Sequence, residues 1–242
     1  MPLNFPERSN QPELMDSFDE PIESLKAVFQ DINRVNKLLG GNNITINAIE
    51  NIIDKNPQEQ YIIVDMGCGD GNMLREVASY FRKNKIIGKF IGIDLNQNAL
   101  SIAKEVSSDF PEIEFVYQNI LKIDAATFSC DILINTLTMH HFTDEQVVLF
   151  LNKFTQLARF AVVINDLQRS RVAYYLFHLF SSIFIKTKIA KIDGLISIRR
   201  AFIKKELFAY SRELPSINHT IKWKWAFRYV WILRPKAIKE NT

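Results

Sequence analysis

The sequence predicts an α/β fold built on a doubly wound, mostly parallel sheet, and two observations carry this prediction. Apolar, β-branched runs alternate with segments of helical periodicity through most of the chain. One such run, at 61–66, leads into alternating glycines at Gly67, Gly69 and Gly71, and helical periodicity begins at Met73. A buried strand, a tight turn and a helix N-terminus in this order favour a site for an anionic or nucleotide-like ligand.

The alternation places each element in turn. Strands are expected near 61–66, 87–94, 112–118, 130–136 and 159–165. Helices are expected near 72–83, 97–108, 143–157 and 169–185. The start of the third of these helices is fixed by a capping box from Thr143 to Gln146. Because strands and helices alternate, helices should cover both faces of the sheet.

The first part of the chain differs in composition from the rest. Residues 1–20 are polar and without period, which predicts a flexible N-terminus. Residues 21–57 predict a helical cap, with one amphipathic helix ending at Gly40 and a second over about 45–55. The same pattern would arise if these helices simply packed on the sheet. The sequence leaves both interpretations open.

The last third of the single domain predicted at 58–242 breaks the alternation. A segment at about 169–210 is apolar and basic and predicts a lid insertion, with helix over 197–214. Apolar residues then occupy every second position over 220–233, which indicates two strands, or one long strand with a bend near Ala226.

Composition limits the classes that remain. The chain has 242 residues, 47% of them hydrophobic, which is enough for one domain with a sizeable core. Its two cysteines form neither a disulfide framework nor a zinc-binding pair, and a cytoplasmic location is expected. Between residues 169 and 205 there are nine Lys or Arg residues and one acidic residue, Asp193, so this stretch is basic. It could face an anionic membrane, a nucleic acid, an acidic substrate or only water.

The glycine spacing separates two cofactor classes. A dinucleotide fingerprint, G-x-G-x-x-G, would need glycine at position 72, where this chain has asparagine. The segments VDMGCGDGN (64–72) and IGIDLN (91–96) together resemble the class I S-adenosylmethionine-dependent methyltransferases. The later segments INDLQRSRVAYY (164–175), ISIRRAF (196–202) and WKWAFRY (223–229) resemble bacterial small-molecule enzymes of the ubiquinone/menaquinone methyltransferase kind. The resemblance implies S-adenosyl-L-methionine as the cofactor. It also implies a Rossmann-like seven-stranded sheet with an antiparallel C-terminal edge strand.

The resemblance assigns cofactor-binding roles to nine positions. Gly67, Gly69 and Gly71 would approach the amino-acid end of the cofactor, and Asp65 would lie near its ammonium group. The other positions follow later strands: Asp94 for the ribose hydroxyls, Leu95 for the adenine face, Asn119 and Ile120 for the adenine edge, and Asn135 at the end of the fourth strand. The family usually has an acid where this chain has Asn119, although an asparagine can still accept a hydrogen bond.

Candidate catalytic residues follow the fourth and fifth strands. By resemblance, His140 and His141 would face the transferred methyl group, and either histidine could remove a proton from a phenol or an activated carbon. Asp166 and Arg169 could point into the same cavity, or they could form a capped and paired helix start. The Asn/Asp-Pro-Pro-aromatic motif of base N-methylating relatives is absent, so a nucleic-acid partner is not favoured.

These residues predict methyl transfer by direct displacement to a small, largely apolar acceptor of phenolic, quinone-like or polyketide-like type. No metal is expected, because the sulfonium methyl is already electrophilic. The apolar stretch 172–185 could form a substrate mouth with peripheral contact at the inner membrane surface, or it could pack inside the protein. An RNA methyltransferase using residues 169–205, or a cofactor-binding protein without catalysis, are the alternatives. The sequence leaves the acceptor and the oligomeric state open.

Overall fold

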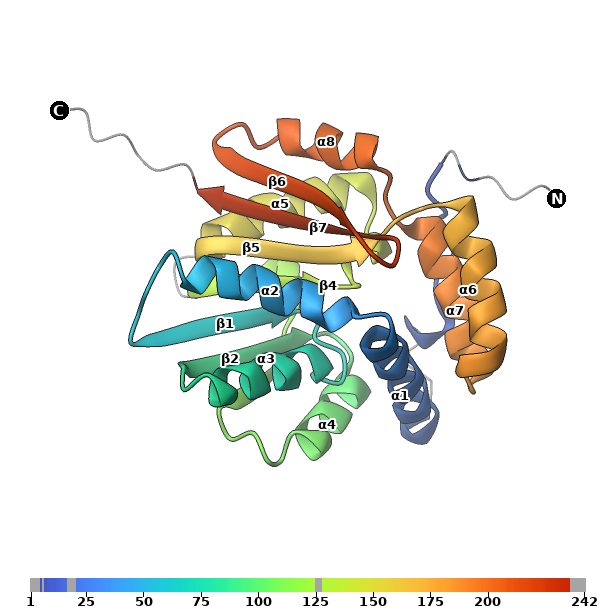
Figure 1. Ribbon diagram of the computed structural model, residues 1–242, viewed down its shortest axis with the longest axis horizontal. Helices are drawn as coiled ribbons and strands as arrows, with labels where there is room; N and C mark the ends of the chain where they lie inside the picture. Colours follow the sequence, from blue (N-terminus) through green and yellow to red (C-terminus); the bar gives the residue numbers. More distant parts are fainter. Residues whose placement is uncertain (1–4, 6, 17–20, 125–127, 236–242) are drawn as a thin grey trace.

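A seven-stranded sheet forms the centre of the molecule in the computed structural model, which describes residues 5, 7–16, 21–124 and 128–235 (Figure 1). The strands are β1 (Gln60–Met66), β2 (Ile87–Asp94), β3 (Ile113–Tyr117), β4 (Cys130–Thr136), β5 (Ala158–Leu167), β6 (Ile217–Lys224) and β7 (Arg228–Pro235). Their order is β3-β2-β1-β4-β5-β7-β6. Strands β1 to β5 are parallel, and the β6–β7 hairpin joins β5 in antiparallel orientation. The predicted fold class is therefore confirmed.

Helices cover both faces of this sheet. One face carries α2 (Gly41–Ile53), α3 (Asn72–Lys83) and α4 (Gln97–Val106), and the other carries α5 (Asp144–Leu157) and α8 (Lys204–Arg212). Because both faces are covered, central strand residues such as Ile63 and Val64 are fully buried, which explains the continuous apolar runs in the sequence. The capping box from Thr143 to Gln146 begins α5 as predicted.

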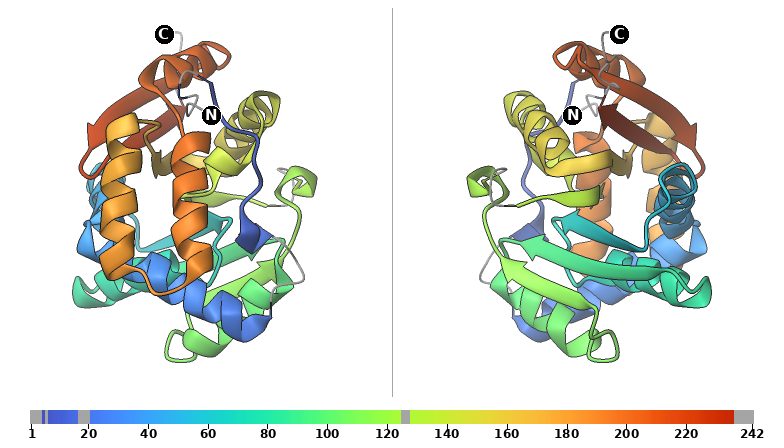
Figure 2. Two further views of the ribbon diagram at one scale, coloured as in Figure 1. Left: turned by 90° about the vertical axis from the view of Figure 1, so that its right-hand side faces the viewer. Right: turned by 90° about the vertical axis from the view of Figure 1, so that its left-hand side faces the viewer.

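Three further helices lie beyond the carboxyl ends of the parallel strands. They are α1 (Ile22–Leu38), α6 (Arg171–Phe184) and α7 (Lys188–Arg200), and α6 and α7 run side by side (Figure 2). Asp31 of α1 is buried and accepts hydrogen bonds from the backbone N–H groups of Lys186 and Thr187, between α6 and α7. These helices thus form a layer over the strand ends where open parallel sheets place their ligands.

The prediction of helix over 197–214 is wrong at its centre. Helix α7 ends at Arg200 and α8 begins at Lys204, and the extended link between them buries Phe202 in the core beside β5. The side chain of Glu206 accepts a hydrogen bond from the backbone N–H of Ile203 and so stabilises the new helix start. Helix α2 also begins earlier than predicted, directly after Gly40. The predicted bend near Ala226 is the turn of the β6–β7 hairpin.

The N-terminal segment, for which the sequence predicts flexibility, follows a definite path where it is described. Residues 7–16 run beside α7 and end in the short 3-10 helix η1 (Leu14–Asp16). The backbone N–H groups of Leu14 and Met15 both donate to the buried carboxylate of Asp193 in α7. This arrangement carries Glu13, which is only 5% exposed, to the ends of the parallel strands.

Candidate functional site

A cavity of about 910 Å³ lies between the carboxyl ends of the parallel strands and the layer of α1, α6 and α7. Its walls come from the β1–α3 loop, the end of β2, the segment after β4, and apolar side chains of α6. The turn between β6 and β7 closes one further part of the wall through Trp225 and Phe227. The cavity therefore lies at the topological position expected for a ligand in an open α/β sheet.

The glycine loop requires glycine at its first position. Gly67 has a φ of 78°, a left-handed conformation that L side chains rarely adopt. A Cβ at Gly67 would also overlap the side chain of Thr138. The backbone N–H of Gly67 donates to the carbonyl of Ile93 over 2.8 Å, which joins the loop to the end of β2. Glycine is therefore required here by the backbone conformation and by the packing of the loop against Thr138.

Asp94 ends β2 and faces the same cavity. Its two carboxylate oxygens accept from the backbone N–H groups of Gly69, over 2.8 Å, and Asn96, over 2.9 Å. The N-cap of α4 is Asn96, whose side chain accepts from the N–H of Ala99, so Asp94 is not needed for capping. A carboxylate has about four lone-pair sites, and Asp94 retains capacity for two hydroxyl donors.

Asp65, at the end of β1, is 2% exposed and lines the cavity. Its Oδ1 has no hydrogen-bond partner among the described residues. Burial, together with the charge of Asp94, raises the pKa of Asp65 well above its usual value. A cation such as an ammonium group would relieve both the missing partner and the charge repulsion, so this position fits the amino-acid end of S-adenosylmethionine.

The structure brings some of the predicted cofactor residues to the cavity and not others. The cavity is lined by Asp65, Gly67, Gly69, Asp94, Leu95 and Ile120. Asn119 does not line it, because its side chain accepts from the N–H of Leu121 and caps η2 (Ile120–Lys122). Asn135 is fully buried and donates to the carbonyl of Met66, while the space beside Gly71 is filled by Phe115. Gly71, Asn119 and Asn135 are therefore not among the residues that line the cavity.

His140 lies in the 3-10 helix η3 (Met139–His141), after β4, and is 2% exposed. Its Nδ1 is 2.7 Å from Oδ1 of Asp166, and its backbone N–H donates to Oδ2 of the same carboxylate. Burial alone would lower the pKa of His140, but the charges of Asp166 and Glu13 outweigh it and raise the pKa to about 9. Asp166 does not line the cavity, so it orients His140 and is a positioning residue.

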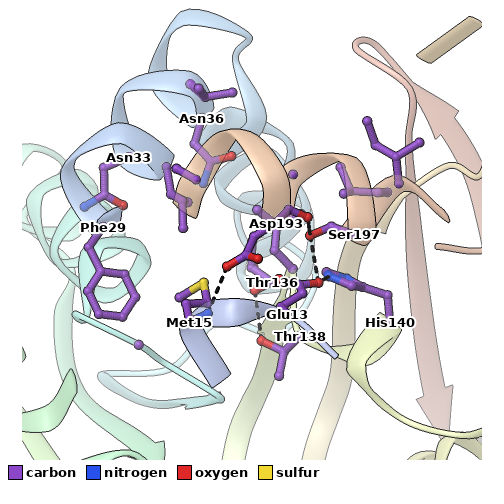
Figure 3. Close-up of a pocket in the computed structure, with 18 of the residues that line it drawn as sticks. Glu13, Met15, Phe29, Asn33, Asn36, Thr136, Thr138, His140, Asp193 and Ser197 are labelled. Atoms are coloured by element: carbon purple, nitrogen blue, oxygen red, sulfur yellow. Dashed lines mark hydrogen bonds and ion pairs between the residues drawn. The ribbon is translucent and has the colours of Figure 1, made fainter. Parts of the chain in front are cut away.

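His141 and Glu13 complete a cluster with His140 at the cavity wall. Nε2 of His140 is 3.3 Å from Oε1 of Glu13, in an ion pair without hydrogen-bond geometry (Figure 3). Nε2 of His141 is 3.6 Å from the same oxygen. Nδ1 of His141 is 3.0 Å from Oδ2 of Asp16. Burial opposes ionisation of Glu13, but the two histidines more than offset it and lower its pKa.

Sequence reasoning missed Glu13 and Arg228. Glu13 lies in the segment predicted to be flexible, and the only signal was the acidic character of the first twenty residues. Arg228, at the start of β7, is 3% exposed and donates to Oδ1 of Asn36 over 2.6 Å. Its Nη1 has no hydrogen-bond partner in the described part of the chain, and burial lowers the pKa of Arg228 to about 10. Arg228 also lines the cavity and places one positive charge there.

The sequence left open whether Arg169 points into the cavity or forms an ion pair at the start of a helix. The structure shows that Arg169 forms the ion pair. Its guanidinium is buried and pairs with the carboxylate of Glu206, and its Nε donates to the carbonyl of Phe5 over 2.9 Å. Arg169 does not line the cavity. It joins the start of α6 to α8 and the N-terminal segment.

Comparison with known proteins agrees with this geometry. Residues 63–159 match the family model described as "Methyltransferase domain". Among curated proteins, the ribosomal RNA small subunit methyltransferase H of Clostridium botulinum (strain Okra / Type B1) is 33% identical over 89 residues. That match covers 37% of this chain and only 28% of the relative's length.

Solved methyltransferase structures share the fold across most of the chain. The plantazolicin methyltransferase BpumL in complex with SAH (S-adenosylhomocysteine) is 14% identical, with a TM-score of 0.67 over 92% of this chain and 94% of that one. The magnesium protoporphyrin IX methyltransferase ChlM of Synechocystis PCC 6803 with bound SAH is 12% identical, with a TM-score of 0.57 over 84% and 87%. The CurJ carbon methyltransferase is 17% identical, with a TM-score of 0.59 over 81% and 54%.

The sheet order and the glycine loop with Asp65 and Asp94 agree with the match over 63–159. Residues 63–159 are thus similar to a methyltransferase domain, and the chain has the fold of solved methyltransferases. The cofactor implied by the sequence fits the residues present, because the loop backbone, an unpaired buried carboxylate and an acceptor for ribose hydroxyls face one cavity.

Proposed function

We propose that the protein transfers the methyl group of S-adenosylmethionine to a small, largely apolar acceptor bound in the same cavity. The observation that carries this proposal is the composition of one continuous cavity. Asp65, Gly67 and Asp94 line it together with Glu13 and the two histidines at 140 and 141. Apolar side chains of α6 and α7 form much of the remaining wall. A cofactor site is therefore joined directly to an apolar acceptor site with a polar end.

The residues around the cavity then have separate roles in methyl transfer. When bound, S-adenosylmethionine supplies an electrophilic methyl group. Asp94 accepts the ribose hydroxyls, and Asp65 pairs with the ammonium group, so the cofactor is held on both sides of its sulfonium. The glutamate–histidine cluster directs an oxygen atom of the acceptor, while Asp166 holds His140 in place. Good alignment of two reactants can lower a barrier by up to ~7–11 kcal/mol, and apolar side chains of α6 and α7 line the site.

The cofactor half of this proposal is tested by titrating the protein with S-adenosylhomocysteine in a calorimeter. We expect binding at one site per chain, and we expect Asp94→Asn to weaken it by roughly 10- to 100-fold, because hydrogen bonds to a charged acceptor are worth ~1.5–3 kcal/mol. Asp109→Asn, an exposed aspartate outside the cavity, is the matched control and should bind normally. Absence of binding by the wild-type protein would contradict the proposal.

Transfer itself is tested with radiolabelled S-adenosylmethionine and pools of phenols, quinols and polyketide-like compounds. A product that carries the label supports an enzyme. A protein that binds S-adenosylhomocysteine but labels no compound in any pool would instead favour the alternative of a cofactor-binding protein without catalysis.

RNA is the second candidate acceptor, because the curated relative is named as a ribosomal RNA methyltransferase. The basic segment 169–205 was the expected RNA-binding surface, but several of its cations are engaged within the protein. Arg169 pairs with Glu206, and Arg200 donates to the carbonyls of Gln11 and His141. This favours the small acceptor. Retention of the protein on immobilised RNA that falls steeply with added salt would favour RNA instead.

We also propose that the exposed face of α6 contacts an anionic membrane surface that delivers the acceptor. Leu179 and Ile183 are 64% and 69% exposed, and both belong to the cavity lining. Basic residues flank this face: Arg171 lies before it, and Lys186 and Lys188 follow it. No helix among the described residues is long and apolar enough to cross a bilayer. An apolar face with basic flanks suits contact with the surface of anionic lipid.

Sedimentation with vesicles tests this contact. The wild-type chain should sediment with vesicles of phosphatidylcholine and phosphatidylglycerol more than with phosphatidylcholine alone. Ile183→Glu should reduce sedimentation with the anionic vesicles several-fold, because it places a negative charge on the apolar face. Phe208→Glu changes an equally apolar exposed residue on α8 and is the control. Equal sedimentation of both variants and the wild type would exclude α6 as the contact.

A further inference from the structure

The cluster of Glu13, His140 and His141 on the cavity wall has the geometry of a metal site. Oε1 of Glu13 is 3.3 Å from Nε2 of His140 and 3.6 Å from Nε2 of His141. One ligand atom from each of the three residues lies within 4.8 Å of the other two. Two atoms that each bind a zinc-like ion at about 2.0–2.1 Å lie roughly 3.4 Å apart in tetrahedral coordination. The two separations from Glu13 agree with this value.

The other ring nitrogen of each histidine is held by a carboxylate. Nδ1 of His140 contacts Asp166 over 2.7 Å, and Nδ1 of His141 contacts Asp16 over 3.0 Å. Histidines that bind metals almost always donate their second ring N–H to a carboxylate or a carbonyl, which fixes the tautomer and the ring orientation. Ser197 similarly donates to Oε1 of Glu13 over 2.8 Å. Both Nε2 atoms are therefore directed at Glu13 by the groups around them.

The cluster also lacks something that a cation would supply. Nε2 of His140, a side chain only 2% exposed, has no hydrogen-bond partner in the part of the chain that is described. Three carboxylates, those of Glu13, Asp16 and Asp166, surround the two imidazole rings. A divalent ion between Glu13 and the histidines would give Nε2 of His140 a partner.

We propose that Glu13, His140 and His141 bind a divalent transition-metal ion of the zinc kind on the wall of the cavity. Two imidazoles and one carboxylate form a donor set that suits zinc and its neighbours in the first transition series. All three residues line the cavity, so the remaining coordination positions of the ion face the space for the acceptor. If the proposed methyl transfer is correct, on which this last step rests, an acceptor with an oxygen atom would bind the ion directly.

Calorimetry with ZnCl₂ tests the site on the full chain after treatment with a chelator. We expect one ion per chain, and we expect His141→Ala and Glu13→Gln each to weaken binding by at least about 10- to 100-fold. The site should also bind Co²⁺ with a visible absorption band that both variants lose. His178→Ala removes an exposed histidine of α6 and is the control, with unchanged affinity. Thermal unfolding of each variant shows whether it is folded.

The outcomes separate this inference from the proposed function. S-adenosylhomocysteine is titrated into the same samples, and its binding does not require the ion. Folded wild-type protein that binds S-adenosylhomocysteine but not Zn²⁺ would overturn the metal site and leave the cofactor site intact. Zinc binding that His178→Ala abolishes, or that both cluster variants retain at full strength, would also overturn the inference, because the ion would then lie elsewhere.

Discussion

At the scale of single residues, the conformation of Gly67 connects the sequence motif with the cavity. This position has a positive φ and lies against Thr138, so two separate constraints exclude a side chain. Gly40 also has a positive φ, of 69°, but nothing lies within 4 Å of the place where its Cβ would be. The two glycines therefore form a natural comparison between strain alone and strain with steric overlap.

Gly67→Ala should lower the free energy of unfolding by more than Gly40→Ala. A left-handed alanine costs roughly 1–2 kcal/mol at either position, and the overlap with Thr138 adds to this cost only at Gly67. Urea unfolding followed by circular dichroism measures both values. Calorimetry should further show that Gly67→Ala loses affinity for S-adenosylhomocysteine while Gly40→Ala keeps it. Equal effects of the two substitutions would mean that the loop is not held against Thr138.

The position of a residue could be predicted from the sequence only where residues close to it in the chain determine that position. Gly67 and Asp94 could be placed from the sequence, because a strand, a turn and a helix start fix their positions within a few residues. Glu13 could not, because it reaches the cavity only through contacts between its own segment and α7, 180 residues later in the chain. Asn119 shows the opposite error, since a local cap takes the side chain that the resemblance assigned to adenine.

At the scale of elements, the layer of α1, α6 and α7 depends on a small number of buried polar contacts. Asp31 of α1 holds the link between α6 and α7 by accepting from two backbone N–H groups, over 2.9 and 2.7 Å. The carboxylate is 2% exposed, so its removal leaves two donors without their partner.

Asp31→Ala should therefore lower the free energy of unfolding by about 2–3 kcal/mol. Gln30→Ala, at an exposed position on the same helix, should change it by less than about 0.5 kcal/mol. Chemical denaturation gives both values. Native-state hydrogen exchange should also become faster at Lys186 and Thr187 in the first variant. If exchange at these two amides stays unchanged, Asp31 does not hold the link.

Element boundaries were predictable where periodicity and capping agree, and not where tertiary packing decides. The strands of the parallel sheet and the start of α5 follow from apolar runs and a capping box. The break between α7 and α8 does not, because no glycine or proline marks it. The helix is broken here because the Phe202 side chain is buried in the core, and burial of an apolar side chain stabilises the fold. This burial depends on strands far away in the sequence.

At the scale of the whole molecule, binding in the cavity should stabilise the entire fold. The cavity lining comes from the N-terminal segment, the loops of the parallel strands and the last hairpin. A ligand at 100 times its dissociation constant adds about 2.7 kcal/mol to the stability of the folded state. For a domain of this size we expect the melting temperature to rise by roughly 5–10 °C with S-adenosylhomocysteine.

Thermal shift measurements with two ligands check this expectation. NAD⁺ at the same concentration should leave the melting temperature unchanged, because the loop lacks the third glycine of the dinucleotide fingerprint at position 72. A larger shift with NAD⁺ than with S-adenosylhomocysteine would reverse the assignment of the cofactor class.

The N-terminal segment and the strand-end loops line the same cavity, but they lie far apart in the sequence, so one can be exchanged without the other. The groups proposed for the cofactor belong to the strand-end loops, whereas Glu13 and the apolar wall of α6 come from outside these strands and turns. Exchange of residues 7–16 and 171–200 for those of another methyltransferase would rebuild one half of the cavity only. Selectivity toward the second reactant can thus diversify while the donor half stays as it is.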